Sequence, residues 1–244
     1  MALFNHTYAL SEPIGEFLKV DLHSHLIPGI DDGSQNLEMS LRLIRGLMSL
    51  GYQKLITTPH INDVFPNDPL TILNRFELLE AEVKRQELPV MLSYAAEYLL
   101  TPDLLELVDT GRVLCIQERY ILVETLYTVR SQSFEQLVFN LRARGYEVIL
   151  AHPERYKYIK SFSEIEKIFE SGCLLQVNLL SLTGHYGQEI QKTAFEILDA
   201  GLCSFLATDL HHEQQLELLS TLRVDTKTRI LLETINFRNN TFLY

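Results

Sequence analysis

The stretch that decides the fold is DLHSHLIPGIDDG, residues 21–33, in which two histidines one residue apart are followed by two aspartates and a glycine. Side chains of a strand alternate between its two faces, so His23 and His25 should share one face, opposite Leu22 and Ser24. Alone, the stretch fits a metal site or a polar loop. It closes a short apolar run, and the other apolar runs of the chain decide between the two.

Short apolar runs with the length and β-branched character of buried strands recur along the chain. We predict strands at residues 16–25, 54–60, 90–97, 119–126, 146–154, 173–180 and 203–211. Most of these runs are apolar on both faces, which is typical of a parallel sheet covered by helices on its faces.

Between these runs the apolar residues recur with a helical period. We predict helices at residues 36–52, 70–87, 133–145, 161–172 and 187–201, four of which end at or beside a glycine. Alternating strands and helices indicate an α/β fold made of βαβ units. The pattern fits both a barrel and an open doubly wound sheet. No linker marks a boundary, so we expect one domain over residues 1–244, with residues 1–15 as an N-terminal extension.

Composition indicates an ordinary globular protein and narrows its partners. Hydrophobic residues make up 46% of the chain, no membrane-length apolar segment occurs, and residues 1–13 do not resemble a secretory signal, so we expect a cytoplasmic protein without membrane insertion. The formal charge of −11 disfavours nucleic acid as a partner. Cys115, Cys173 and Cys203 form no CxxC pair and are expected to be buried, reduced thiols.

The polar residues of the predicted strands gather at their C-terminal ends. In chain order these are His23 and His25, His60, Glu97, Glu124, His152, and the pair Asp209 and His211. In parallel α/β folds the C-terminal strand ends converge on one face, where active sites form. We therefore expect these side chains to meet.

Imidazoles and carboxylates gathered in an apolar enclosure need cations, because a buried charge must be paired or coordinated. Five histidines and at least four carboxylates, with Asp32 as the fourth, are too many for one tetrahedral zinc and suffice for two or three divalent ions. Nitrogen and oxygen ligands without thiolate suit Mn, Fe or Zn.

The order and spacing of these motifs resemble one known family. HSH at 23–25, DDG at 31–33, TPH at 58–60, Glu97, Glu124 ahead of AHPERY at 151–156, and TDLH at 208–211 resemble the polymerase-and-histidinol-phosphatase (PHP) family. Within it the chain looks most like the bacterial manganese-dependent protein-tyrosine-phosphatase branch, which is linked to the tyrosine kinases of capsule and exopolysaccharide synthesis. The likeness spans about residues 18–212.

The resemblance implies a distorted (β/α)7 barrel with a trinuclear centre, manganese being the expected metal. The first ion would take His23, His25, Glu97 and Asp209. The second would share Glu97 and add Glu124 and His152, and the third would take Asp32, His60 and His211. Asp32 is preferred to Asp31 because it directly precedes the glycine; Asp31 would then orient a ligand histidine or cap the following helix.

The resemblance also implies catalytic residues. Arg155 matches an arginine that faces the substrate phosphate, and Asp32 and His60 join it as catalytic groups. A second phosphate-facing arginine, expected soon after the DxH motif, is absent from HEQQLELL at 212–219, and Arg130 is the alternative.

The expected function is metal-dependent hydrolysis of phosphotyrosine in a protein, with the tyrosine-rich tail of a bacterial polysaccharide-synthesis tyrosine kinase as the expected partner. The chain has no Cys-x5-Arg loop, and hydrolysis by a metal-activated water needs no cysteine nucleophile. The alternatives are a histidinol-phosphate or other small-molecule phosphatase and, from another class, a non-catalytic metal-binding regulatory protein. A nuclease is disfavoured by the acidic charge.

Overall fold

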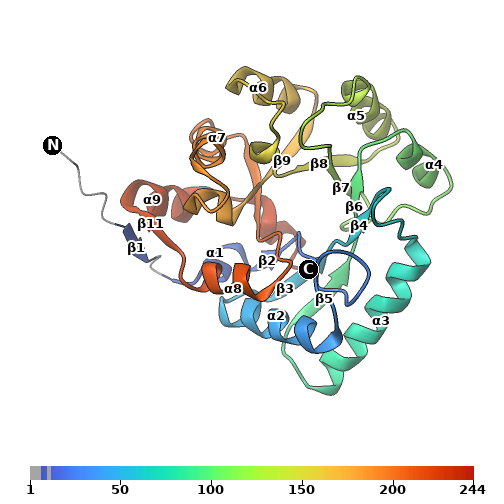
Figure 1. Ribbon diagram of the computed structural model, residues 1–244, viewed down its shortest axis with the longest axis vertical. Coiled ribbons are helices and arrows are strands. Elements are labelled where there is room, and N and C mark those ends of the chain that lie inside the picture. The colour runs from blue at the N-terminus through green and yellow to red at the C-terminus, as the bar shows by residue number, and fades with distance from the viewer. Residues whose placement is uncertain (1–6, 10–11) are drawn as a thin grey trace.

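The computed structural model describes residues 7–9 and 12–244 and has an α/β fold with parallel sheets, as expected (Figure 1). A three-stranded parallel sheet has the order β2-β3-β5, formed by Val20–Asp21, Lys54–Thr57 and Met91–Tyr94. A six-stranded parallel sheet has the order β10-β9-β8-β7-β6-β4, formed by Cys203–Ala207, Cys173–Asn178, Glu147–Ala151, Tyr120–Glu124, Glu97–Leu99 and His60–Ile61.

Two of the predicted strands are interrupted and contribute to both sheets. The chain leaves β3 at Thr57 and enters β4 at His60, and it leaves β5 at Tyr94 and enters β6 at Glu97. Pro59 stands in the first interruption, where its missing N–H cannot join a strand ladder. Backbone hydrogen bonds from Ala95 N to Thr57 O (3.0 Å) and from Glu97 N to Pro59 O (3.1 Å) carry the pairing across the break.

The segments that follow β2 and β10 lie side by side, although they come from opposite ends of the chain. Ser24 and Leu210 form a parallel bridge, His25 N donates to Leu210 O (2.9 Å) and Asp209 N donates to His23 O (2.9 Å). At the other end of this seam, the Asn239 amide bonds to Val20 O, Leu206 O and Leu206 N at 2.9, 2.7 and 3.2 Å. At about 1 kcal/mol for each buried hydrogen bond, this side chain contributes on the order of 3 kcal/mol to the seam.

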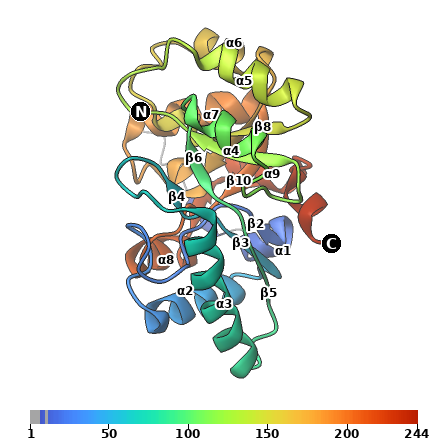
Figure 2. The ribbon, with the colours of Figure 1, turned by 90° about the vertical axis from the view of Figure 1, so that its right-hand side faces the viewer.

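Helices lie on the outer side of the strands in both views (Figures 1 and 2). The predicted helices are confirmed as α2 (Leu37–Ser49), α3 (Pro69–Arg85), α5 (Phe134–Ala143), α6 (Phe162–Glu170) and α7 (Gln188–Asp199). The sequence pattern missed α4 (Asp103–Asp109), α8 (Glu213–Ser220) and α9 (Thr226–Thr234), of which the first two are only seven and eight residues long. Short 3-10 turns η1, η2 and η3 cover Pro153–Arg155, Leu179–Thr183 and Arg238–Phe242.

The predicted strand at residues 16–25 is wrong in its first half. Residues Ile14–Leu18 form the short helix α1, because Ile14 and Leu18, four residues apart, bury one helical face. The N-terminal extension predicted at 1–15 lies partly outside the described residues. Its described part includes β1 (Thr7–Ala9), which pairs antiparallel with β11 (Arg223–Asp225).

Two apolar clusters support the polar strand ends. The larger cluster lies where helices pack on the sheets; the smaller one gathers inward residues of the strands, including Ile56, Leu122, Ile149 and Phe205, with Phe242 from η3 stacked on Phe205. Cys173 and Cys203 are buried as expected, whereas Cys115 is only partly buried, and all three are unpaired. Among the described residues, no helix has the length and apolar character needed to cross a membrane.

Candidate metal centre

The structure brings all nine predicted ligand residues to one place at the C-terminal strand ends. Their ligand atoms form overlapping groups in which every atom lies within 4.8 Å of the others. These groups are His23/His25/Glu97, His23/His152/Asp209, His60/Glu97/Glu124 and His25/Asp32/His60/His211. The overlap makes a continuous cluster rather than separate sites.

The innermost part of the cluster is closed off from solvent. His23 Nε2 lies 3.2 Å from Glu97 Oε2 and 3.3 Å from Asp209 Oδ1, and His25 Nε2 lies 3.5 Å from each of these oxygens. All four side chains are buried. We call these four residues the inner group.

Glu97 joins the inner group to the next one. Its Oε1 lies 3.1 Å from His152 Nε2, and its Oε2 lies 3.1 Å from His60 Nδ1. His60 Nδ1 also lies 3.3 Å from Glu124 Oε1, to which Asn62 Nδ2 donates at 3.3 Å. Glu97 is thus placed as a carboxylate that two cations could share.

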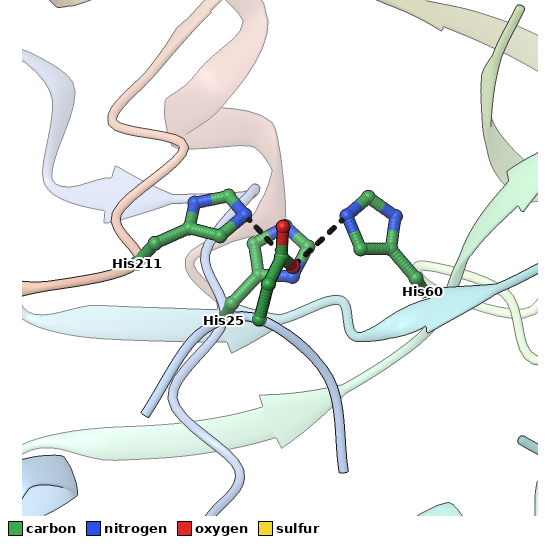
Figure 3. Close-up of side chains that lie close together, drawn as sticks. His25, His60 and His211 are labelled. Atoms are coloured by element: carbon green, nitrogen blue, oxygen red, sulfur yellow. Dashed lines mark ion pairs between the residues drawn. The ribbon is translucent and has the colours of Figure 1, made fainter. Parts of the chain in front are cut away.

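Asp32, His60 and His211 form an outer group that reaches solvent. Asp32 Oδ1 lies 3.5 Å from both His60 Nε2 and His211 Nε2, and its side chain is 54% exposed. Figure 3 shows His25, His60 and His211 turned toward one another, with dashed lines for the two ion pairs of the carboxylate. The rings of His25 and His211 stack with centroids 3.9 Å apart.

Hydrogen bonds behind the histidines fix their rings. His23 Nδ1 lies 2.8 Å from Gln176 Oε1, His25 Nδ1 lies 2.8 Å from Asp31 Oδ2, and His211 Nδ1 lies 2.8 Å from the Asp209 carbonyl. A proton held on each Nδ1 leaves the Nε2 lone pair free for a metal.

Asp31 has the orienting role that was one of its two alternatives. Besides His25, it accepts from the backbone N–H groups of Gly33 and His60, whereas helix α2 is capped by Asn36. A Cβ at position 33 would lie 2.3 Å from His25 Cβ, so only glycine fits beside this histidine.

Charge in the inner group shifts its pKa values in opposite directions. Burial lowers the pKa of His23, but Glu97 and Asp209 outweigh it and raise this pKa to about 9. The pKa values of Glu97 and Asp209 lie well below their ordinary range despite burial, chiefly because of the charge of His23. The carboxylates therefore need positive charge, which protons supply when no metal is bound.

The donor set fits divalent cations. Glu97 Oε2 and His60 Nδ1 are buried, 3.1 Å apart, and neither has a hydrogen-bond partner within the described part of the chain. A cation between them would satisfy both atoms. Mixed imidazole and carboxylate ligands suit Mn, Fe or Zn.

Arg155 places a positively charged side chain beside the cluster. Its Nη1 donates to Asp209 Oδ2 at 2.7 Å, and its guanidinium lies over the rings of Tyr127 (5.2 Å) and Tyr186 (4.5 Å). Its side chain remains 21% exposed, so it can still reach a ligand. The alternative cation, Arg130, instead donates to Glu135 at 2.6 Å and lies over Phe134, which engages its guanidinium outside the cluster.

The backbone is strained at two of these positions. His152 (φ 34°) and Asp209 (φ 51°) lie in the left-handed region, which is unfavourable for residues other than glycine. His152 directly follows β8, and Asp209 follows β10 after Thr208, so both residues leave the strand geometry where their side chains join the cluster.

Apart from Asp31, the sequence pattern did not indicate the side chains that hold the ligands. In β9, Gln176 and Asn178 share one face, and Asn178 Nδ2 donates to Asp209 Oδ2 at 2.7 Å. Two amides two residues apart at the end of an apolar run are the available signal. The positions of Tyr127 and Tyr186 carried no periodic signal, because both belong to loops.

The three thiols do not resemble nucleophiles. Burial raises the pKa of Cys115 and of Cys173 to about 12 and that of Cys203 higher still. A thiol with so high a pKa holds its proton at neutral pH.

Fold and site together define the class: an α/β protein with a histidine- and carboxylate-lined metal-binding centre at the C-terminal ends of its parallel strands. Within this class, the chain belongs to the CpsB/CapC family of capsular polysaccharide synthesis, whose model matches residues 19–218.

Named relatives agree with this membership. The tyrosine-protein phosphatase YwqE of Bacillus subtilis is 26% identical over 196 residues, which cover 79% of this chain and 77% of YwqE. The putative tyrosine-protein phosphatase CapC of Staphylococcus aureus is 28% identical over 195 residues, which cover 79% of this chain and 76% of CapC.

Solved structures share the fold. One from a crystallographic study of YwqE from B. subtilis and CpsB from Streptococcus pneumoniae, described as unique metal-dependent tyrosine phosphatases, matches with a TM-score of 0.77 and 24% identity over 87% of this chain and 85% of that one. Histidinol phosphate phosphatase from Lactococcus lactis, solved with zinc, L-histidinol and phosphate, matches with a TM-score of 0.54 and 12% identity over 89% and 94% of the two chains.

Proposed function

We propose that this protein is a metal-dependent phosphatase that hydrolyses phosphotyrosine in proteins. The observation that carries the proposal is the position of Arg155, a cation beside a buried cluster of metal-capable groups, in a chain whose named relatives are tyrosine-protein phosphatases. An arginine fork binds the oxygens of a phosphate, and divalent ions beside it stabilise charge on the same group.

The proposed ligands divide into three sets that share residues. His23, His25, Glu97 and Asp209 would hold one ion; Glu97, Glu124 and His152 a second; and Asp32, His60 and His211 a third, with manganese as the expected metal. The distances of the inner and outer groups and the orphaned oxygen of Glu97 support this division.

In the proposed reaction the bound ions supply Lewis acidity and lower the pKa of water. Arg155 binds the phosphate oxygens and aligns phosphorus for in-line attack. Asp32 lies on the open side, where a hydrogen bond from His211 lowers its pKa and keeps it ionised, so it would orient the attacking water by accepting a hydrogen bond, while His60 holds its carboxylate in place. The leaving phenol has an ordinary pKa of about 10 and needs little protonation.

A protein substrate suits the surroundings of Arg155. A groove of about 640 Å³ begins at Arg155 and Tyr186 and runs between residues 156–162 and the start of α7. Lys157, Lys160 and Lys192 line it, together with Glu189 and Glu196. This groove could bind the residues that flank the phosphotyrosine in a polypeptide substrate. The partner we propose is the tail of a polysaccharide-synthesis tyrosine kinase.

We also propose that the strands form one distorted (β/α)7 barrel in a single domain. β3 with β4 and β5 with β6 would each count as one strand, and the Ser24–Leu210 bridge would close the barrel between its first and last strands. The hydrogen bonds across this seam support the proposal.

The test is turnover by metal-stripped protein resupplied with Mn, Fe or Zn. We expect a phosphotyrosine peptide to be hydrolysed with kcat/KM at least about tenfold above that for histidinol phosphate. Preference for histidinol phosphate would reject the tyrosine-phosphatase proposal and leave the metal centre standing. Absence of turnover of either compound with every metal would favour the non-catalytic alternative.

A further inference from the structure

Arg155 is fixed by contacts on several sides. Asp209 accepts from Nη1, the Tyr186 ring lies 4.5 Å from the guanidinium carbon, and the Tyr127 ring lies 5.2 Å from it. Aromatic faces attract a guanidinium through the ring quadrupole and restrict the plane in which it can lie. The Nη1 contact with Asp209 leaves Nη2 and Nε as the donors for a ligand.

The segment after the metal-ligating pair supplies no second cation. No lysine or arginine stands between Asp209 and Arg223. Helix α8 in this segment instead supplies Gln215, which is buried at 8% exposure although it is an amide. A buried amide is costly unless its hydrogen bonds are made, so its partners indicate its role.

Both ends of the Gln215 amide are used. Its Oε1 accepts from His211 N at 2.7 Å, and its Nε2 donates to the Tyr186 hydroxyl at 3.5 Å, a long hydrogen bond. Tyr186 lies in the loop between η2 and α7, where its ring packs against the larger apolar cluster and its hydroxyl accepts from Gln215. Burial raises the pKa of Tyr186 to about 12, so the hydroxyl that Gln215 holds is neutral.

We propose that Gln215 and Tyr186 are positioning residues for phosphate recognition: Gln215 fixes Tyr186, and the Tyr186 ring fixes the plane of the Arg155 guanidinium that binds the phosphate. This inference rests on the proposed function for the nature of the ligand. A guanidinium that is already oriented loses less conformational freedom when it binds an anion, so the pair should strengthen binding with little effect on the chemical step.

The ring and the hydroxyl of Tyr186 can be separated by substitution. Tyr186→Leu removes the ring face, whereas Tyr186→Phe keeps it and removes only the contact with Gln215. Gln215→Leu breaks the same contact from the other side, and Gln214→Leu, at the exposed neighbouring position on α8, is the matched control.

The first measurement is the Kd of inorganic phosphate for the manganese-loaded protein, by calorimetry, which needs no turnover. We expect Tyr186→Leu to raise this Kd about fivefold and Gln215→Leu to raise it about threefold. The Kd of Tyr186→Phe should be lower than that of Tyr186→Leu. Gln214→Leu should leave the Kd unchanged. With p-nitrophenyl phosphate, KM should rise in parallel while kcat stays within about twofold.

Two controls test the route through Arg155. In an Arg155→Met background, Tyr186→Leu should add no further loss of phosphate binding, because the group that it positions is gone. A full additional loss there would overturn the proposal. A lower metal content in Gln215→Leu would also overturn the proposal, because Gln215 would then support metal binding by His211. Unchanged phosphate Kd in Tyr186→Leu would also reject it, whereas absence of p-nitrophenyl phosphate turnover in the wild type would reject the proposed function instead.

Discussion

The inner and outer groups of the centre use the same kinds of side chain in opposite surroundings. Glu97 and His23 are fully buried, whereas Asp32 is 54% exposed and His211 is partly exposed. In the inner group, Asp209 Oδ2 accepts from Asn178 and Arg155, and the rings of His23 and His25 bond to Gln176 and Asp31. The side chain of Asp32, by comparison, has His60 and His211 as its ion-pair partners. This difference supports the proposal that the inner group holds metal and that the outer group meets substrate and water.

The largest effect should follow from neutralising the inner group. Glu97→Gln keeps the shape of the side chain but removes the charge shared by two proposed ion sites, so we expect loss of metal and a fall in kcat/KM of about a thousandfold or more. Metal content by mass spectrometry and turnover of a phosphotyrosine peptide measure it. Glu87→Gln, at an exposed position, is the control. Near-normal metal content in Glu97→Gln would mean that the charge of the inner group is not needed for metal binding.

Neutralising the outer group should affect turnover more than metal. Asp32→Asn removes an exposed carboxylate whose neighbours remain, so we expect kcat to fall about a hundredfold while at most one metal equivalent is lost. The exposed residue Asp63→Asn is the control. If Asp32→Asn instead lost all its metal, the two groups would not differ in the way described.

Removing a support of the inner group should have a smaller effect. Gln176→Leu leaves His23 in place but withdraws the oxygen bonded to its Nδ1, and we expect metal affinity to fall about tenfold with the fold unchanged. Competition with a chelator of known affinity measures the change. The same affinity in mutant and wild type would mean that packing alone orients His23.

The smallest effect is a pH dependence of the metal-free protein. The pKa of His23 is raised from 6.5 to about 9, so its contribution to the free energy of unfolding is complete below pH 6.5 and is lost as the pH rises through 9. The pKa values of Glu97 and Asp209 are lowered, so their contribution is present above about pH 4.5 and is lost on acidification. We expect the melting temperature to be highest between these limits and to fall by a few degrees at pH 9.

Metal reverses the alkaline side of this dependence. Bound cations would replace the protons on the inner histidines, so the melting temperature of the manganese-loaded protein should not fall between pH 6.5 and 9. A His23→Gln variant without metal should show a smaller alkaline decline, because His25, whose pKa is also raised, remains. A decline of equal size in this variant would assign it to other groups.

The candidate site could be predicted from the sequence because a parallel α/β fold places the C-terminal ends of its strands on one face. All nine predicted residues therefore meet, even where strands are interrupted at Pro59 or where His152 and Asp209 leave the strand geometry. The supporting groups depend on which strands and loops become neighbours: Gln176 contacts a histidine 153 residues away, and Gln215 contacts Tyr186 across 29 residues. No local pattern encodes such contacts. The helix at Ile14–Leu18 was missed because five residues are too few to display a period.

The seam between the segments that follow β2 and β10 sets an order of events during synthesis. His23 and His25 are synthesised well before Asp209 and His211, and Asn239, which joins Val20 to Leu206, follows later still. A nascent chain cannot complete the inner group until Asp209 has been synthesised. Of the three proposed ligand sets, the one made of Glu97, Glu124 and His152 is therefore synthesised first, and the two sets that need Asp209 or His211 are completed later.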